Sequence, residues 1–169
     1  LRRFLCVLLS AALLAAGWLG LSGLPLVVAL VPLLWISRSY GSSRRDWWGM
    51  FGWAWLAFVL WNGATIWGLW YSTPVGPFAA TLVSTFLNML AFMLFHTVSK
   101  RAHKALAYTL LVAGWIATEY WYTVGEFSFP WLLLGNGFAN DTWAVQWYEY
   151  PGIFGGTVWV LVCKLLFFE

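Results

Sequence analysis

Long apolar runs separated by short links constrain this chain more than any other feature of its sequence. Only 9% of its 169 residues are charged and 62% are hydrophobic, whereas a soluble domain has about 25% charged and 45–50% apolar residues. A soluble protein of this size would expose much of that apolar surface and would aggregate. Disordered chains are poor in aromatic residues, yet 21% of this chain is aromatic. The sequence therefore predicts a protein of the lipid bilayer.

We expect six transmembrane helices, because a helix needs about 20 apolar residues to cross the hydrocarbon core. The apolar runs that predict them cover residues 4–21, 24–36, 48–70, 78–98, 105–122 and 153–168. The second run is short for a full crossing, and Pro25 is well placed to open it. The predicted fold class is all-α, a polytopic bundle of membrane helices that forms one transmembrane domain over residues 1–169.

The basic residues predict how these helices are oriented. They precede the first run, separate the second from the third and the fourth from the fifth, or lie near the far end of the sixth: Arg2, Arg3, Arg38, Arg44, Arg45, Lys100, Arg101, Lys104 and Lys164. The links on the opposite side have no basic residue. In the longest of them, residues 123–150, all the charged residues are acidic. Short loops rich in Lys and Arg stay in the cytoplasm. We therefore expect a cytoplasmic N-terminus.

The long outer loop, residues 123–150, has an unusual aromatic content for a segment exposed to water. It contains Phe127, Phe129, Trp131, Phe138, Trp143, Trp147 and Tyr148. Aromatic side chains with a polar edge favour the headgroup level of a bilayer. The apolar run from Pro130 to Leu134 is too short to span. We expect this loop to be re-entrant or interfacial, or to fold back against the helices.

Glu119 is the one carboxylate inside a predicted helix, near the outer end of the fifth apolar run. An acid within the membrane is costly, and it indicates a function or a specific partner. The alternative is that Glu119 lies at headgroup depth, where water or a counter-ion satisfies it.

The fourth run carries polar residues at a spacing that places them on one helix face. Such a stripe joins helices by hydrogen bonds or lines a substrate groove, and Asn62 and Thr65 of the third run are candidate partners. Its members are Thr81, Ser84, Thr85 and Asn88.

Other polar and small residues carry weaker signals. Gly152 and Gly156 have the spacing that permits close helix approach. His96 and His103 flank basic residues, so we expect them to be solvated at the interface rather than to bind a metal. We find no nucleophile–base set, no cofactor motif, and no basic face on a soluble module that would bind nucleic acid.

The segment from Trp115 to Phe138 combines three short motifs in a fixed order. A helix carrying W..TE, which ends at Glu119, is followed by Phe129-Pro130-Trp131 and then by Gly135. This order and spacing resemble the signature of bacterial apolipoprotein N-acyltransferases. The continuation over residues 145–150 and 152–156 resembles the versions found in Bacteroidetes. The resemblance covers essentially the whole chain, although Tyr122 stands where some members have Arg.

The resemblance implies an enzyme of the bacterial inner membrane whose functional face is periplasmic. Such enzymes take an acyl chain from a phospholipid and transfer it to the amino group of a diacylglyceryl-cysteine on a lipoprotein. A nitrilase-like domain with a Glu–Lys–Cys triad follows the helices in that family, and this chain lacks it. Neither Cys6 nor Cys163 lies in the motif that surrounds the family's nucleophile. The resemblance therefore implies no catalytic residue here and an inactive fragment.

We expect the chain to be part of a longer protein, because it starts at Leu1 and its last apolar run stops at Glu169. In this interpretation the fragment supplies lipid access and anchoring. The resemblance predicts substrate-binding residues in and just after the fifth helix: Glu119, Phe129, Pro130, Trp131, Gly135 and Asn136.

Two other classes remain open from the sequence. A small multi-helix transporter or substrate-capture subunit would use polar residues near the bilayer midplane, of which there are few. A purely structural membrane partner is the third possibility. The downstream reading frame of the gene discriminates between them, since a nitrilase-like region there would indicate the acyltransferase.

Overall fold

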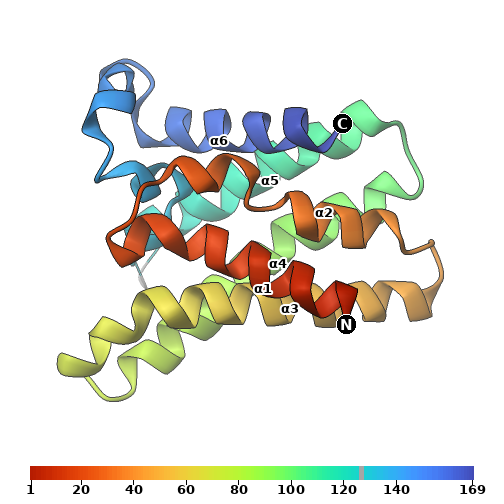
Figure 1. Cartoon of the computed structure of the whole chain (residues 1–169), viewed down its shortest axis with the longest axis horizontal. Coiled ribbons are helices and arrows are strands. Elements are labelled where there is room, and N and C mark those ends of the chain that lie inside the picture. Colours follow the sequence, from red (N-terminus) through yellow and green to blue (C-terminus); the bar gives the residue numbers. More distant parts are fainter. Residues whose placement is uncertain (126–127) are drawn as a thin grey trace.

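The computed structural model of the chain describes residues 1–125 and 128–169, and over these residues it is helical without any strand. The α-helices run lengthwise along the molecule (Figure 1). Their bounds are Arg2–Ala15 (α1), Val31–Arg38 (α2), Arg44–Ile66 (α3), Gly76–Ser99 (α4), Lys104–Val124 (α5) and Gly152–Phe168 (α6). The all-α class predicted from the sequence is confirmed. Glu126 and Phe127, an acid and an aromatic residue of the expected outer loop, lie outside the described residues.

Short 3-10 helices connect these elements: Ala16–Leu19 (η1), Leu24–Val28 (η2), Trp67–Tyr71 (η3), Pro130–Leu132 (η4), Leu134–Phe138 (η5), Thr142–Ala144 (η6) and Gln146–Glu149 (η7). The second apolar run differs from the single helix expected over residues 24–36, because η2 and α2 divide it. Pro32 lies in the first turn of α2. Proline has no N–H and its ring clashes with the preceding turn, so it is disfavoured inside a continuous helix and favoured where a helix begins.

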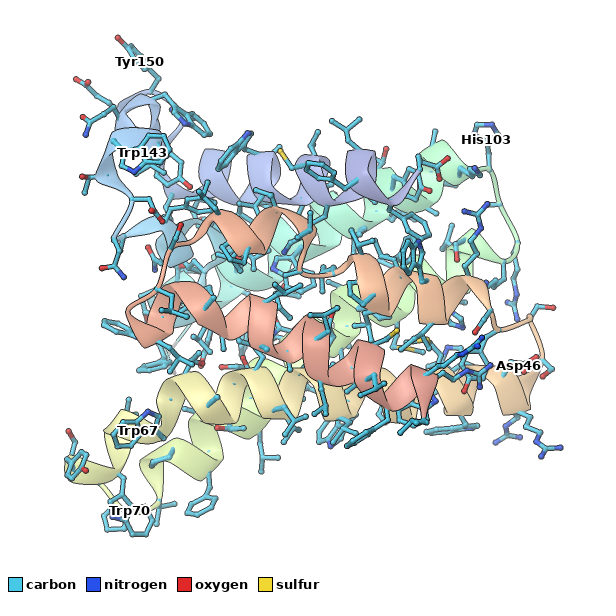
Figure 2. All side chains as sticks on the ribbon, in the orientation of Figure 1. Asp46, Trp67, Trp70, His103, Trp143 and Tyr150 are labelled. Carbon is cyan, nitrogen blue, oxygen red and sulfur yellow. The ribbon has the colours of Figure 1, made fainter. Side chains whose placement is uncertain are left out.

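The two ends of the molecule differ in composition. Both chain termini, the α2–α3 link and the α4–α5 link lie at one end, which we call the basic end because it gathers the helix ends that carry most Lys and Arg (Figure 1). Figure 2 shows Asp46 and His103 at this end, and Trp67, Trp70 and Trp143 at the opposite, aromatic end. The links expected on the two sides of a membrane thus lie at opposite ends. The cytoplasmic N-terminus stays a prediction.

Two helical stretches are long and apolar enough to cross a membrane, Arg2–Leu19 and Gly76–Ser99. Two further apolar stretches, Leu24–Arg38 and Gly152–Phe168, are shorter. This finding rests on length and composition alone, so the expected total of six crossings stays a prediction.

Helix α4 packs against both α3 and α5, and the polar stripe on it contributes to both contacts. Asn62 Nδ2 of α3 donates to Thr85 Oγ1 at 3.0 Å, and Ser84 Oγ lies 2.9 Å from the Tyr122 hydroxyl of α5. These side chains therefore join helices, as expected for part of the stripe. Thr65, the other expected partner, instead donates to the backbone oxygen of Trp61 within α3.

Candidate functional site

The outer segment, residues 128–151, lies over the aromatic end of the helices (Figure 1). Leu132, Leu134 and Phe138 of this segment are buried against the bundle, while Trp131 and Trp143 are exposed. Figure 2 shows Tyr150, near the end of this segment, projecting away from the helices. The segment therefore folds back onto the helices with its apolar residues inward and a few rings outward.

Glu119 anchors the segment to α5. Its Oε1 accepts hydrogen bonds from the backbone N–H of Leu134 at 2.8 Å and from Trp115 Nε1 at 3.2 Å. Its Oε2 accepts from the hydroxyl of Thr157, on α6, at 2.7 Å. Only 6% of Glu119 is exposed. The carboxylate is thus satisfied by buried donors of the protein rather than by water at headgroup depth.

Thr157 extends this network to a second backbone amide. While its hydroxyl donates to Glu119, its oxygen accepts from the N–H of Gly135 at 3.1 Å. Two consecutive amides of the outer segment, those of Leu134 and Gly135, are therefore held by side chains of α5 and α6. A side chain at position 135 would overlap Ile153, so glycine is required for this close approach.

The other side of the segment is anchored to the turn between η1 and η2. Asp141 accepts hydrogen bonds from the Ser22 hydroxyl at 3.1 Å and from the N–H of Gly23. Trp18 Nε1 donates to the carbonyl of Trp131 at 2.9 Å. A Cβ at Gly17 would overlap the carbonyl of Gly137. The backbones meet closely here, and partners more than 110 residues apart in sequence hold them together.

Gly156 has a different role from the one its spacing suggests. A Cβ at this position would overlap the ring of Tyr148 in the outer segment. The expectation that the Gly152–Gly156 pair permits close approach of another helix is corrected: at Gly156 the space admits an aromatic side chain. Burial raises the pKa of Tyr148 to about 12 and the negative charge of Glu119 adds to this, so its hydroxyl stays protonated and donates to Gly135 O at 3.4 Å.

The remaining predicted substrate-binding residues divide into exposed and anchored groups. Pro130 and Trp131 are exposed, the latter by 59%, whereas Phe129 is half-buried with its ring against Tyr122. Asn136 Nδ2 donates to the carbonyl of Pro130 at 2.8 Å, which closes the turn that presents Trp131. All of them lie in one folded unit with Gly135 and Glu119, and only the exposed rings are open to a ligand.

The space beside Glu119 is too small for a substrate. A pocket lined by Ser84, Asn88, Tyr122 and Leu132 adjoins its side chain and has a volume of about 10 Å³. A cavity needs about 10–15 Å³ to hold a single water molecule. This pocket therefore leaves no room for a substrate beside Glu119, whose carboxylate contacts donors of the protein itself.

Two larger apolar grooves lie on α4. One, of about 530 Å³, runs between α3 and α4 and includes Gly63, Trp67 and Phe78. The other, of about 740 Å³, runs between α4 and α5 and includes Phe86 and Trp121. Leu82 lines both grooves. Binding sites for small molecules have volumes of about 300–1,000 Å³, so each groove has room for an apolar chain.

One expectation about the ionisable groups is corrected. His96 is buried rather than solvated, and its Nδ1 lies 2.8 Å from Ser37 Oγ. Lys164 lies near the C-terminal end of α6, as expected, and is fully buried. Among the described residues its Nζ has no hydrogen-bond partner. No group of three His, Cys, Asp or Glu side chains that could hold a metal occurs in the described ranges.

Comparison with known proteins now adds to this geometry. Residues 5–166 match the family model described as the apolipoprotein N-acyltransferase N-terminal domain. The chain belongs to this family. It is 29% identical over 139 residues to an apolipoprotein N-acyltransferase of Chlorobaculum tepidum. That match covers 82% of this chain and 25% of the relative, so the chain spans about a quarter of its length. No solved structure matches the chain.

The family resemblance inferred from the W..TE and Phe-Pro-Trp motifs is thereby confirmed. Sequence reasoning missed Asp141, Thr157 and Trp18 as anchors of the outer segment. Asp141 had one usable signal, since it is one of three acids in a loop rich in aromatic residues. Thr157 and Trp18 had none, because their partners are brought near only by the docking of the segment.

Proposed function

We propose that the chain is the membrane part of an apolipoprotein N-acyltransferase in the bacterial inner membrane, with its aromatic end facing the periplasm. The full-length enzyme would transfer an acyl chain from a phospholipid to the N-terminal diacylglyceryl-cysteine of a lipoprotein. The observation that carries this proposal is the family match over residues 5–166. Catalytic groups would come from a nitrilase-like domain outside this chain.

The chain's own contribution would be lipid access. The two grooves on α4 present apolar walls, and Phe78, Leu82 and Phe86 are exposed along the same helix. In a bilayer such a surface exchanges one apolar neighbour for another, so an acyl chain enters from the side without crossing water. The groove between α3 and α4 reaches η3, at the aromatic end, through Trp67 and Trp70. A chain lying there would keep its ester near the headgroup plane.

The outer segment would serve as the platform on which the reacting groups meet. Trp131 and Pro130 are its exposed residues in the family motif, and we propose that they contact the substrate or the catalytic domain. Glu119, Gly135 and Asn136 would act through the fold by holding the turn that presents Trp131. Holding reactants in place contributes several kcal/mol to catalysis.

Filling the grooves tests lipid access. In the full-length protein, Leu82→Trp places a large ring where the two grooves meet. We expect kcat/KM for a long-chain phospholipid donor to fall by about tenfold, the scale on which one misfitting group changes apolar recognition. The kcat/KM for a short-chain, water-soluble acyl donor should stay unchanged. Leu166→Trp, which enlarges an exposed residue of α6, is the matched control.

Equal losses with both donors would refute the proposed role of the grooves, since the substitution would then act on the fold or on chemistry. The fragment itself provides a second test. The 169-residue chain alone, reconstituted in phospholipid vesicles with a diacylglyceryl lipopeptide, should show no N-acylation. Transfer by the isolated chain would overturn the assignment of catalysis to another domain.

A further inference from the structure

A pocket at the basic end, far from the outer segment, has a composition that the acyl-transfer function does not require. It has a volume of about 150 Å³ and lies where the C-terminal ends of α2, α4 and α6 meet the N-terminal end of α5. Arg38, Lys100 and Lys104 line it, together with Tyr108 and Glu169. Three cationic side chains and one carboxylate therefore share a single small cavity.

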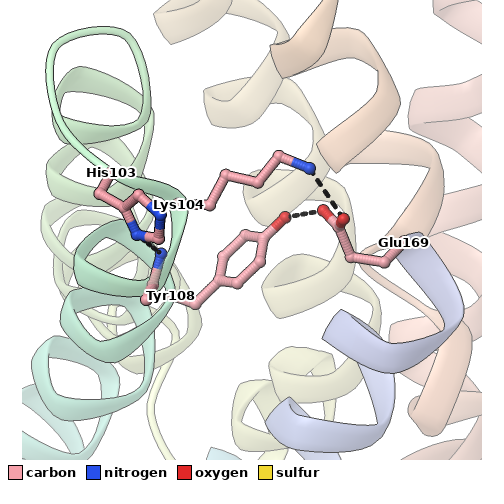
Figure 3. A network of polar contacts seen from close by, with 5 residues as sticks. His103, Lys104, Tyr108 and Glu169 are labelled. Carbon is pink, nitrogen blue, oxygen red and sulfur yellow. Dashed lines mark hydrogen bonds and ion pairs between the residues drawn. The ribbon is translucent and has the colours of Figure 1, made fainter.

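The carboxylate neutralises one of these cations. Figure 3 shows Lys104 and Tyr108 both pointing at the carboxylate of Glu169. Lys104 Nζ donates to its Oε2 at 2.8 Å and the Tyr108 hydroxyl donates to its Oε1. These hydrogen bonds hold the pKa of Glu169 below its usual value, so it is ionised at neutral pH. The pocket retains two positive charges, those of Arg38 and Lys100.

Among the described residues neither of these cations forms an ion pair, although the Arg38 guanidinium adds to the lowering of the pKa of Glu169. Lys100 Nζ donates to the carbonyl of Ser37 at 2.8 Å, and the Arg38 guanidinium lies 5.8 Å from the centre of the Phe168 ring. Burial lowers the pKa of Lys100, Asp46 partly offsets this, and the Arg38 guanidinium lowers it further. An anion bound between the two side chains would relieve their mutual repulsion.

The walls of the pocket indicate which anion it would take. Leu34, Phe95 and Phe168 contribute apolar surface beneath the basic residues. Trp35 and Phe167, their neighbours in sequence, are exposed large apolar side chains. A phosphate that carries hydrocarbon chains matches both parts, and basic pockets between membrane helices on the cytoplasmic side bind the headgroups of anionic lipids.

We propose that this pocket binds a phosphate group, that of an anionic phospholipid in the cytoplasmic leaflet. Arg38 and Lys100 would hold the phosphate, while chains of the lipid would pack beside Trp35 and Phe167. The site would fix the basic end at the membrane surface, opposite to the end proposed for acyl transfer.

Lipid retention by the full-length protein tests the site. The protein is reconstituted in nanodiscs of phosphatidylcholine with a minor share of phosphatidylglycerol, released into detergent, and the retained lipids are measured by native mass spectrometry. Two basic side chains near a membrane surface correspond to about a thirtyfold change in affinity for the anionic lipid. The double variant Arg38→Gln/Lys100→Gln should lose about that factor in retained phosphatidylglycerol.

Arg44→Gln/Arg45→Gln is the matched control, because it removes two exposed charges at the same end from residues that do not line the pocket. Its charges act only through the surface potential and do not converge on one phosphate, so its loss of retained phosphatidylglycerol should be clearly smaller than that of the pocket variant. If the double variant does not fold, the single variant Arg38→Gln tests the site, since the Arg38 guanidinium makes no hydrogen bond within the pocket lining. We expect it to lose about fivefold in retained phosphatidylglycerol.

A further experiment distinguishes a lipid phosphate from free inorganic phosphate. Adding phosphatidylglycerol to phosphatidylcholine nanodiscs should raise the melting temperature of the protein. Adding millimolar inorganic phosphate to nanodiscs of pure phosphatidylcholine should not. An equal rise that Arg38→Gln abolishes would overturn the lipid as the source. Retention that falls as much in the Arg44→Gln/Arg45→Gln control as in the pocket variant would overturn the site, since the basic residues would then act only through overall charge.

Discussion

Removing the Glu119 carboxylate should release the outer segment from the helices. Glu119→Ala leaves three donors without an acceptor: the N–H of Leu134, Trp115 Nε1 and the Thr157 hydroxyl. All three residues are fully buried, so water cannot replace the lost acceptor without opening the site.

The size of the effect follows from these contacts. An unsatisfied buried donor costs about 1–3 kcal/mol, whereas side-chain hydrogen bonds between membrane helices average only about 0.6 kcal/mol. One of the three donors is a buried backbone amide of the docked segment. We therefore expect local opening to become easier by about 3–5 kcal/mol.

Glu119→Gln separates the geometry of the acceptor from its charge. The amide oxygen of Gln accepts from Leu134 and Trp115 as the carboxylate does, and its NH₂ group donates to Thr157 Oγ1. Only the hydroxyl proton of Thr157 loses its acceptor, so we expect a loss of about 1 kcal/mol. Glu149→Ala removes an exposed acid from the same segment and is the matched control.

Hydrogen–deuterium exchange of the full-length protein measures this directly at the amides of Leu134 and Gly135. Exchange there should accelerate by at least about a hundredfold in Glu119→Ala, by about tenfold or less in Glu119→Gln, and not in Glu149→Ala. If Gln proves as disruptive as Ala, the negative charge matters and the hydrogen-bond argument is wrong. Unchanged exchange in Glu119→Ala would show that the network does not hold the segment.

Three further substitutions test other parts of the structure in thermal unfolding experiments. Gly17→Ala should destabilise the protein by about 1–3 kcal/mol because the added Cβ would overlap a backbone carbonyl. Gly52→Ala, at a position with open space around it, should not destabilise it, and equal effects of the two substitutions would contradict the close approach at Gly17. Asp141→Ala should cost about 2–3 kcal/mol through lost bonds to Ser22 and Gly23, and an unchanged melting temperature would refute its anchoring role. Lys164→Met should stabilise by about 1–3 kcal/mol, since it removes a buried ammonium without a described partner; destabilisation would indicate that Lys164 is satisfied.

The sequence predicts the helical class well, and it predicts the outer segment less completely. The expected run over residues 78–98 corresponds to α4 at Gly76–Ser99, and that over residues 105–122 to α5 at Lys104–Val124, because an apolar run of about 20 residues has few alternatives to a helix in lipid. The aromatic loop was expected to be interfacial, re-entrant or folded back. Its sequence could not choose between these, since the choice depends on Asp141 and Glu119 meeting partners on other elements.

Local patterns determined the all-α class, the sidedness of the charges and the family motif from Trp115 to Gly135. These properties depend on residues close together in the chain, where hydropathy and spacing are sufficient. Only the tertiary structure decided that Glu119 holds a backbone segment, that Gly156 admits Tyr148, and that Lys164 is buried. Each of these depends on contacts between elements far apart in sequence, and a burial pattern on one helix does not specify what covers it.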